Sequence, residues 1–129
     1  MSIDQFNLIK VLGKGSYAKV VLVKKKDDNK VFAIKMLKKS YIELKKQVDH
    51  IKTERNILVS ADHPFIIKLY FSFQNERKLF FVLDYCPGGE LFNLLCRNKR
   101  FDEYSVKFYV SQVVLALEYL HSKNIIYRE

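Results

Sequence analysis

Two glycines near the start of the chain separate two short segments of β-forming residues. Gly13 and Gly15 lie between Phe6–Leu12 and Val20–Lys25, which are rich in Val, Ile, Leu or Phe. Glycines in such a turn let backbone N–H groups approach a phosphate, so a strand, glycine loop and strand can together bind a nucleotide. A Rossmann site would need a helix after the glycines, and a Walker loop would end in Gly-Lys-Ser/Thr; neither is present. A tight hairpin whose glycines supply positive φ is the alternative.

The pattern that follows predicts three more strands and one helical segment. Val31–Leu37, Ile67–Phe73 and Leu79–Leu83 are apolar segments bounded by polar turns, which is typical of strands. From Ser40 to Ser60 the spacing of the core-type residues changes to three and four, which indicates a helix. We therefore expect five strands with one helical segment between the third and the fourth.

The composition changes after Tyr85 and divides the chain in two. Cys86–Gly89 reads Cys-Pro-Gly-Gly and cannot continue a strand comfortably, because Pro lacks an N–H donor and paired glycines loosen the backbone. Glu90–Arg97 is then predicted as a short helix, and Asp102 as the N-cap of a long helix that runs to about His121. The apolar surface of the long helix is too wide for a helix exposed on one side, so this helix requires a partner.

Composition excludes several classes of protein. The 129 residues are 49% apolar, which is enough for the core of one domain. No segment matches a signal peptide or a membrane span, so we expect a soluble, intracellular and cytoplasmic protein. Cys86 and Cys96 are too few for a disulfide framework and lack the company of metal ligands, so no metal site is expected. The net charge of +9 leaves nucleic-acid binding as an alternative, but no aromatic residues interleave the lysines, and we expect no nucleic-acid partner.

Two charged residues interrupt apolar faces at positions that favour an ion pair. Lys35 lies in an apolar strand and shares a face with Ala33 and Leu37 by alternation. Glu54 follows Ile51 by three residues, which places a carboxylate on the apolar stripe of the predicted helix. A Lys35–Glu54 ion pair would satisfy both buried charges and bring the ammonium group to the phosphates of a nucleotide. The alternative is that both groups lie at the edge of their apolar faces and are simply solvated.

The glycine loop, the lysine and the glutamate occur in the order and spacing of the protein kinase signature. The chain resembles the small lobe and first large-lobe helices of an AGC-group serine/threonine protein kinase, the group that includes protein kinases A, B and C. In the glycine loop Ala18 replaces the third glycine, as it does in some members near the atypical protein kinase C branch. The matching segments cover essentially the whole chain and include Leu12–Val20, Phe32–Lys35, Lys52–Leu58, His63–Phe65 and Leu79–Phe92.

The resemblance implies an α+β fold in two parts. Residues 1–85 would be a kinase N-lobe that binds the nucleotide, with a five-stranded antiparallel sheet and the αB and αC helices. The αB helix would be an extra turn around Tyr41–Lys46. Residues 86–129 would be the hinge and an incomplete C-lobe that contains its first two helices.

The resemblance also implies an ATP site. Lys35 would contact the phosphates and Glu54 would hold it in place, so these two are the expected catalytic residues of the lobe. Leu83 would be the gatekeeper beside the adenine, and Asp84 and Cys86 would offer backbone hydrogen bonds to the base. The residues expected to bind the nucleotide are Leu12, Gly13, Lys14, Gly15, Ser16, Tyr17, Ala18, Lys19, Val20, Ala33, Lys35, Leu83, Asp84, Cys86 and Glu90.

Three further features are implied by the resemblance. Glu90 would lie near the ribose and could receive a basic side chain of the substrate, with an ordinary acidic residue at a helix start as the alternative. His50 matches a histidine that meets the activation-loop phosphate in several AGC kinases, with a surface or packing histidine as the alternative. The groove beside the αB turn would dock the aromatic tail peptide known as the hydrophobic motif.

The last residues resemble the start of the catalytic loop. Tyr127 stands where most kinases have His, and Glu129 stands where they have the substrate-orienting Asp, which makes Glu129 a third candidate catalytic residue. The alternative is that Glu129 is only the end of a truncated chain or of an imperfect gene model. The ligands of Mg²⁺ in kinases, an Asp of Asp-Phe-Gly and a catalytic-loop Asn, are not among the 129 residues.

We therefore expect a complete protein that transfers the γ-phosphate of ATP to Ser/Thr of protein substrates. These include basic-directed substrates, which are recognised through a basic side chain. The 129 residues by themselves are expected to be inactive. A pseudokinase or truncated fragment that acts as a binding or regulatory module is the alternative function.

Overall fold

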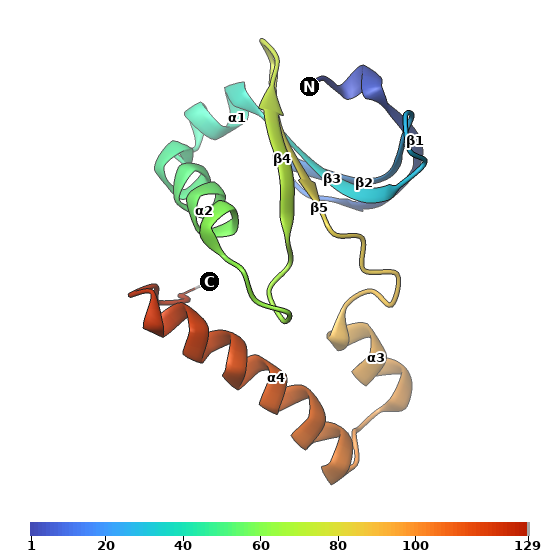
Figure 1. Cartoon of the computed structure of the whole chain (residues 1–129), viewed down its shortest axis with the longest axis vertical. Coiled ribbons are helices and arrows are strands. Elements are labelled where there is room, and N and C mark those ends of the chain that lie inside the picture. Colours follow the sequence, from blue (N-terminus) through green and yellow to red (C-terminus); the bar gives the residue numbers. More distant parts are fainter. Residues whose placement is uncertain (129) are drawn as a thin grey trace. The chain divides into compact units, whose positions relative to one another are not determined.

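The computed structural model of the chain describes residues 1–128 (Figure 1). Residue contacts divide the chain into two units, of which the first comprises Met1–Ser60 and Ile67–Tyr85. The second unit comprises Ala61–Ile66 and the chain from Cys86 onward. After a 3₁₀ turn at Ile3–Gln5, the elements are β1 (Phe6–Lys14), β2 (Ala18–Lys25), β3 (Val31–Lys38), α1 (Lys39–Leu44), α2 (Val48–Ser60), β4 (Leu69–Gln74), β5 (Lys78–Leu83), α3 (Leu91–Asn98) and α4 (Glu103–Ser122).

The five strands form one antiparallel sheet in the order β1-β2-β3-β5-β4, as the α+β prediction requires. Although β1 and β4 are the two edges, the ring of Phe6 on β1 stacks on that of Phe73 on β4, with centroids 6.2 Å apart. The sheet is therefore curled enough to bring its edges together. The right-handed twist of neighbouring strands accumulates into curvature of this kind.

Each face of the sheet carries an apolar core. Inside the curl, Val23, Ile34 and Val82 are fully buried. On the other face, Leu37 of β3 packs against α1 and against the buried Ile51 of α2, and Figure 1 shows the two helices together on one side of β4. Each such side chain contributes about 1.5–3 kcal/mol through burial, so the two cores hold the strands and both helices in one unit.

The helical segment expected at Ser40–Ser60 is broken in the structure, which corrects that prediction. Lys46 adopts a left-handed conformation with φ of 55°, and a residue of this kind ends a helix. The N–H of Gln47 donates to the carbonyl of Ile42 at 2.9 Å and closes the turn. Two helices follow from this break, and α1 lies where the extra turn was expected around Tyr41–Lys46.

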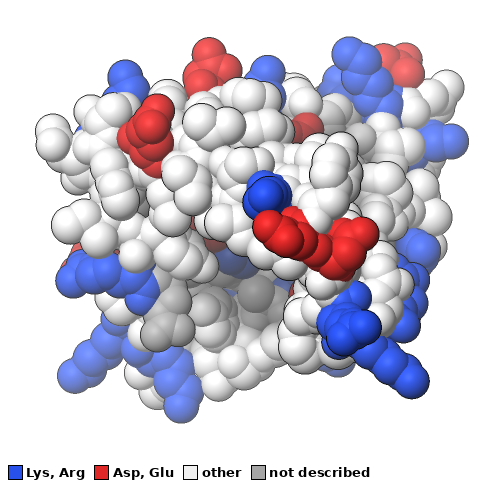
Figure 2. Space-filling model, turned by 90° about the horizontal axis from the view of Figure 1, so that it is seen from below, with Lys and Arg blue, Asp and Glu red and all other residues white. Residues whose placement is uncertain are grey.

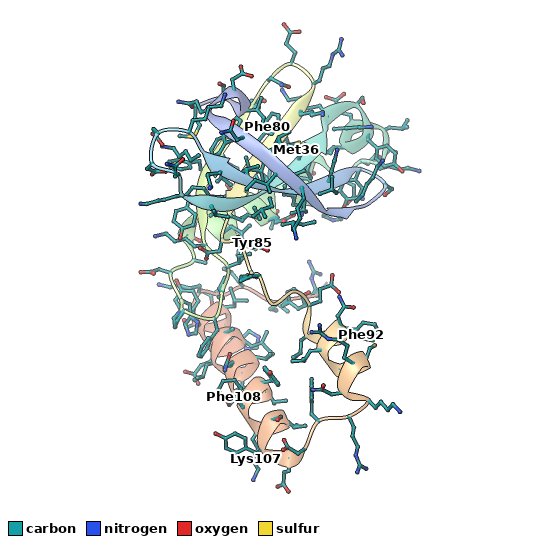
Figure 3. All side chains as sticks on the ribbon, turned by 90° about the vertical axis from the view of Figure 1, so that its right-hand side faces the viewer. Met36, Phe80, Tyr85, Phe92, Lys107 and Phe108 are labelled. Carbon is teal, nitrogen blue, oxygen red and sulfur yellow. The ribbon has the colours of Figure 1, made fainter. Side chains whose placement is uncertain are left out.

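The second unit contains α3, α4 and the segment 61–66. Asp102 caps α4 as predicted, through a 2.8 Å hydrogen bond from a backbone N–H of the first turn to its carboxylate. Near the other end of α4, the hydroxyl of Tyr119 accepts a 3.0 Å hydrogen bond from the N–H of Asp62. No side chain of α3 or α4 is buried, and Phe92 and Phe108, labelled in Figure 3, are 67% and 53% exposed. The apolar surface of α4 is therefore largely uncovered within this unit.

Candidate functional site

An ion pair joins β3 to α2 in the first unit. The ammonium nitrogen Nζ of Lys35 donates a hydrogen bond to Oε1 of Glu54 at 2.8 Å, so the predicted pair is formed. The two side chains keep 24% and 37% of their surface exposed, so the charges are only partly buried, which corrects the expectation of two buried charges. Because solvent screens the pair, it contributes at most about 1 kcal/mol to folding. The ammonium group remains accessible to an anionic ligand.

The packing of α2 on the sheet explains why these two residues meet. Ile51 is buried against Leu37 and Phe81. Residues three positions apart lie on the same side of a helix, so the packing of Ile51 also turns Glu54 toward the sheet. Lys35 lies directly opposite Phe81 of β5, so its side chain leaves the sheet on the face that α2 covers.

The glycine loop closes the hairpin between β1 and β2, and the N–H of Gly15 donates to the carbonyl of Ala18 at 2.7 Å. Neither Gly13 nor Gly15 has a positive φ, so the alternative that they serve a turn of that kind is wrong. A Cβ on Gly13 would meet nothing within 4 Å, and a Cβ on Gly15 would meet only the Ala18 oxygen at 3.6 Å. The fold therefore does not require glycine at either position. The close approach of a ligand to the backbone remains a physical reason for glycine at both of these positions.

An aromatic contact that the sequence does not predict holds the tip of this loop. The ring of Tyr17 stacks on that of Tyr41 of α1, with centroids 5.9 Å apart and an interplanar angle of 18°. The carbonyl of Tyr17 also accepts a 3.2 Å hydrogen bond from the N–H of Lys38. The loop is therefore attached to α1 and to the end of β3. No motif specifies this pair of tyrosines, so the sequence offers no signal for it.

Four of the residues expected at the site share one face of the sheet. Val20 of β2 lies directly opposite Lys35, and Leu83 of β5 lies directly opposite Ala33. Direct cross-strand neighbours share a face, and so do residues two apart along a strand. The apolar residues and the ammonium group are thus arranged side by side on the face that also carries α2.

Other residues of the loop do not bring their side chains to this face. Lys19 lies opposite Met36 of β3 and opposite Lys14 of β1, and Met36 belongs to the core inside the curl. The side chains of Lys14 and Lys19 therefore leave the sheet on the side away from the ion pair. Leu12 falls at an irregularity in the β1–β2 pairing and is exposed, as is Ser16 at the loop. At Lys14 and Lys19 only the backbone can serve a ligand held beside the ion pair.

Asp84 directly follows β5, and its side chain is bound to the start of β4. Its Oδ2 accepts a 2.9 Å hydrogen bond from the N–H of Lys68, and its Oδ1 accepts a 2.7 Å hydrogen bond from the hydroxyl of Tyr70. The bond to the carboxylate raises the pKa of the Tyr70 phenol, since ionisation would break it and place two negative charges together. The sequence predicts Asp84 as a backbone contact, and it contains no signal that identifies Lys68 and Tyr70 as partners.

The remaining predicted residues lie outside the first unit or are solvated. The carbonyl of Cys86 accepts a 3.2 Å hydrogen bond from the N–H of Gly89, whose φ of 76° favours glycine, so the predicted linker forms a turn. Glu90 is the N-cap residue of α3 and makes no capping bond through its side chain. His50 is exposed on α2. Glu129 lies outside the described residues.

Comparison with known proteins assigns the family. The protein kinase domain matches residues 6–129. The chain belongs to the protein kinase domain family. The kinase relatives span several organisms and include "Protein kinase 3" of Dictyostelium discoideum, 50% identical over 129 residues that make up 100% of this chain and 14% of the relative.

Two further relatives carry serine/threonine-protein kinase in their names. "Serine/threonine-protein kinase Sgk2" of Mus musculus is 50% identical over 125 residues, which are 96% of this chain and 34% of the relative. "Serine/threonine-protein kinase gad8" of Schizosaccharomyces pombe is 46% identical over 129 residues, which are 100% of this chain and 23% of the relative. The predicted place among AGC-group serine/threonine kinases is thereby confirmed. This kinase segment spans about a seventh to a third of the length of these relatives.

Residues 1–128 contain no group of three His, Cys, Asp or Glu side chains that could hold a metal ion by themselves. None of the helices in these residues is long and apolar enough to cross a membrane. On the face shown in Figure 2, basic side chains lie mainly near the rim with acidic ones among them, and uncharged side chains cover much of the rest.

Proposed function

We propose that this chain is the ATP-binding portion of a serine/threonine protein kinase, whose complete form transfers the γ-phosphate of ATP to Ser/Thr of protein substrates. The proposal is carried by the 2.8 Å ion pair between Lys35 and Glu54, which holds an accessible ammonium group beside apolar residues of the same face. Gly13 and Gly15, which the fold itself does not require, support it. An ammonium group and backbone N–H groups are the groups with which kinases position phosphates.

In this proposal residues 1–85 are the N-lobe, and residues 86–129 are the hinge and the first part of the C-lobe. The ammonium of Lys35 binds ATP phosphates, and Glu54 keeps it in place. Backbone N–H groups of the glycine loop contact the same phosphates. Val20, Ala33 and Leu83 contact the adenine ring. The backbones of Asp84 and Cys86 bind the polar edge of the base.

Nucleotide titration followed by thermal unfolding tests this proposal. ATP is expected to stabilise the wild-type chain in a concentration-dependent manner, because a ligand that binds only the folded state raises its stability. Lys35→Ala should abolish the shift. Lys30→Ala is a matched control, since it also removes a positive charge but lies exposed in the β2–β3 turn. An equal shift in the wild type and Lys35→Ala would contradict the assigned role of the ammonium group.

The same proposal holds that the 129 residues bind the nucleotide without turnover. In kinases the Mg²⁺ ions are held by the Asp of an Asp-Phe-Gly segment and by an Asn of the catalytic loop. The 129 residues contain no Asp-Phe-Gly, and no Asn follows residue 125. A radiolabelled phosphotransfer assay with the purified chain and a Ser/Thr peptide should therefore give no product. Phosphotransfer that disappears on Lys35→Met would refute this part of the proposal.

For the complete kinase, we assign Glu90 as a contact for a basic side chain of the protein substrate. Its carboxylate makes no capping bond to α3 and is exposed, so it is free to pair with a cation. In the full-length enzyme, Glu90→Gln should raise KM for a peptide with a basic residue near the Ser/Thr. It should leave KM for a peptide without that residue unchanged, and equal effects on both peptides would contradict the assignment.

A second candidate function is a binding or regulatory module, and a groove in the first unit favours it. The groove has a volume of about 660 Å³ and lies between α1 and α2 on one side and β4 and β5 on the other. Its lining includes the apolar residues Ile42, Val48, Ile51 and Phe81. A peptide with the aromatic residues of a hydrophobic motif should bind it, and Val48→Glu at its exposed rim should weaken that binding. Binding of the peptide without any response to ATP would favour this function over the first.

A further inference from the structure

The antiparallel pairing of β4 with β5 continues for one residue pair beyond the ends of the two strands. Leu69 lies opposite Leu83, so the next pair consists of Lys68 and Asp84. In an antiparallel ladder, a hydrogen-bonded pair exchanges two main-chain bonds, one from each N–H to the carbonyl of the other residue. The N–H of Asp84 makes its bond to the carbonyl of Lys68, at 3.1 Å.

A side chain makes the other bond of this pair. The N–H of Lys68 donates at 2.9 Å to the carboxylate oxygen Oδ2 of Asp84, in place of the carbonyl of Asp84. The hydroxyl of Tyr70 donates to Oδ1 at 2.7 Å and fixes the orientation of the carboxylate. Among the bonds formed within residues 1–128, none ends at the Asp84 carbonyl oxygen.

We propose that the carboxylate of Asp84 releases the carbonyl of the same residue from the β-ladder, so that the carbonyl can accept a hydrogen bond from an amino group on a bound base. This inference rests on the proposed nucleotide-binding function. Asp84 is then a positioning residue through its side chain as well as a contact through its backbone. A carbonyl oxygen accepts and does not donate, so it favours a base with an exocyclic amino group over one without.

The release depends on competition for one N–H group. Lys68 is exposed, so once the carboxylate is removed its N–H can be served by water or by the carbonyl of residue 84. Without the carboxylate, the acceptor nearest in the ladder is the carbonyl of residue 84, and the pair would close with two main-chain bonds. The carbonyl would then already be engaged when the base arrives.

Two nucleotides and three variants test the proposal on the 129-residue chain. The affinity of ATP is compared with that of purine riboside triphosphate, which lacks the exocyclic amino group. One hydrogen bond of this kind corresponds to a preference for ATP of about twofold to tenfold in the wild type. In Asp84→Ala the preference should fall to about one, because the carbonyl returns to the ladder. Isothermal titration calorimetry measures both affinities.

Conservative variants separate this effect from the loss of charge or of fold. In Asp84→Asn the amide oxygen can still accept from Lys68, while its NH₂ group can donate to the Tyr70 oxygen, so the preference for ATP should be retained. Tyr70→Phe removes only the second contact of the carboxylate, so the preference should lie between those of the wild type and Asp84→Ala. A preference for ATP that is unchanged in Asp84→Ala would overturn the proposal.

A measurement without nucleotide distinguishes this inference from the proposed function. The scalar coupling across a hydrogen bond, between the Lys68 amide nitrogen and the backbone carbonyl carbon of residue 84, should be absent in the wild type and present in Asp84→Ala. A wild-type chain that binds neither nucleotide overturns the proposed function and the selection of the base with it. A coupling already present in the wild type overturns the release of the carbonyl, whatever the nucleotide results.

Discussion

Replacing Lys35 by Met separates the role of the ion pair in folding from its role in binding. The two charged atoms are 2.8 Å apart, but the side chains are 24% and 37% exposed, so the pair adds at most about 1 kcal/mol to the free energy of unfolding. Met has a similar length, and the face it would occupy carries the apolar residues Leu37 and Phe81. Apolar contact with them offsets part of the loss, so we expect Lys35→Met to unfold with a free energy within about 1 kcal/mol of the wild type.

The response to nucleotide should change far more. At a free ATP concentration of 100 times Kd, binding stabilises the wild-type chain by about 2.7 kcal/mol, which raises Tm by roughly 10 °C for a chain of this size. Lys35→Met should show almost none of this rise at the same concentration. Urea unfolding gives the first quantity and a thermal scan with ATP gives the second. Glu54→Gln is the companion variant, because its amide oxygen still accepts a hydrogen bond from Lys35 but carries no charge.

Two results would refute this reasoning. A loss of more than about 3 kcal/mol in the absence of nucleotide would show that the pair behaves as a fully buried one. An undiminished rise of Tm with ATP in Lys35→Met would show that the ammonium group does not contact the nucleotide.

Three other predictions concern packing, capping and pH. Ile51→Ala should lower the free energy of unfolding, measured in urea, by about 2–4 kcal/mol, because Ile51 is 6% exposed and holds α2 to the sheet. The control is Val59→Ala on the exposed side of α2, which should change that free energy by less than about 0.5 kcal/mol. Asp102→Ala should fray the first turn of α4, which would be measured as faster amide exchange in that turn. In the wild type the capping bond lowers the pKa of the Asp102 carboxyl, so the same fraying should appear as the pH falls below about 3.8. The raised pKa of Tyr70 implies that its bond to Asp84 stabilises the fold below about pH 10 and that this stability is lost as the pH rises through the folded pKa. A spectrophotometric titration of the wild type, compared with Tyr70→Phe, measures the pKa of the Tyr70 phenol. A phenol that titrates at or below its ordinary pKa would contradict the bond.

The strands could be predicted because their signals are local. Apolar segments bounded by Gly, Pro, Asn or Asp gave all five strands to within a few residues, and Asp102 marked the start of α4 through its capping position. The break between α1 and α2 could not be predicted in the same way. Lys46 carries no preference for the left-handed conformation, so no residue type in the sequence marks the turn that the bond from Gln47 to Ile42 closes.

The sequence by itself determined the kinase family, the order of the strands along the chain and the pairing of Lys35 with Glu54. The pairing could be predicted because each of these two charged residues interrupts the regular spacing of apolar residues in its own segment. Only the tertiary structure decided how exposed that pair is, how Tyr17 is attached to α1, and which acceptor the Lys68 N–H uses. The physical reason is that these features depend on groups brought together by sheet pairing and helix packing. Lys68 and Asp84 are 16 positions apart, and no local pattern shows that a carboxylate will take the place of a carbonyl between them.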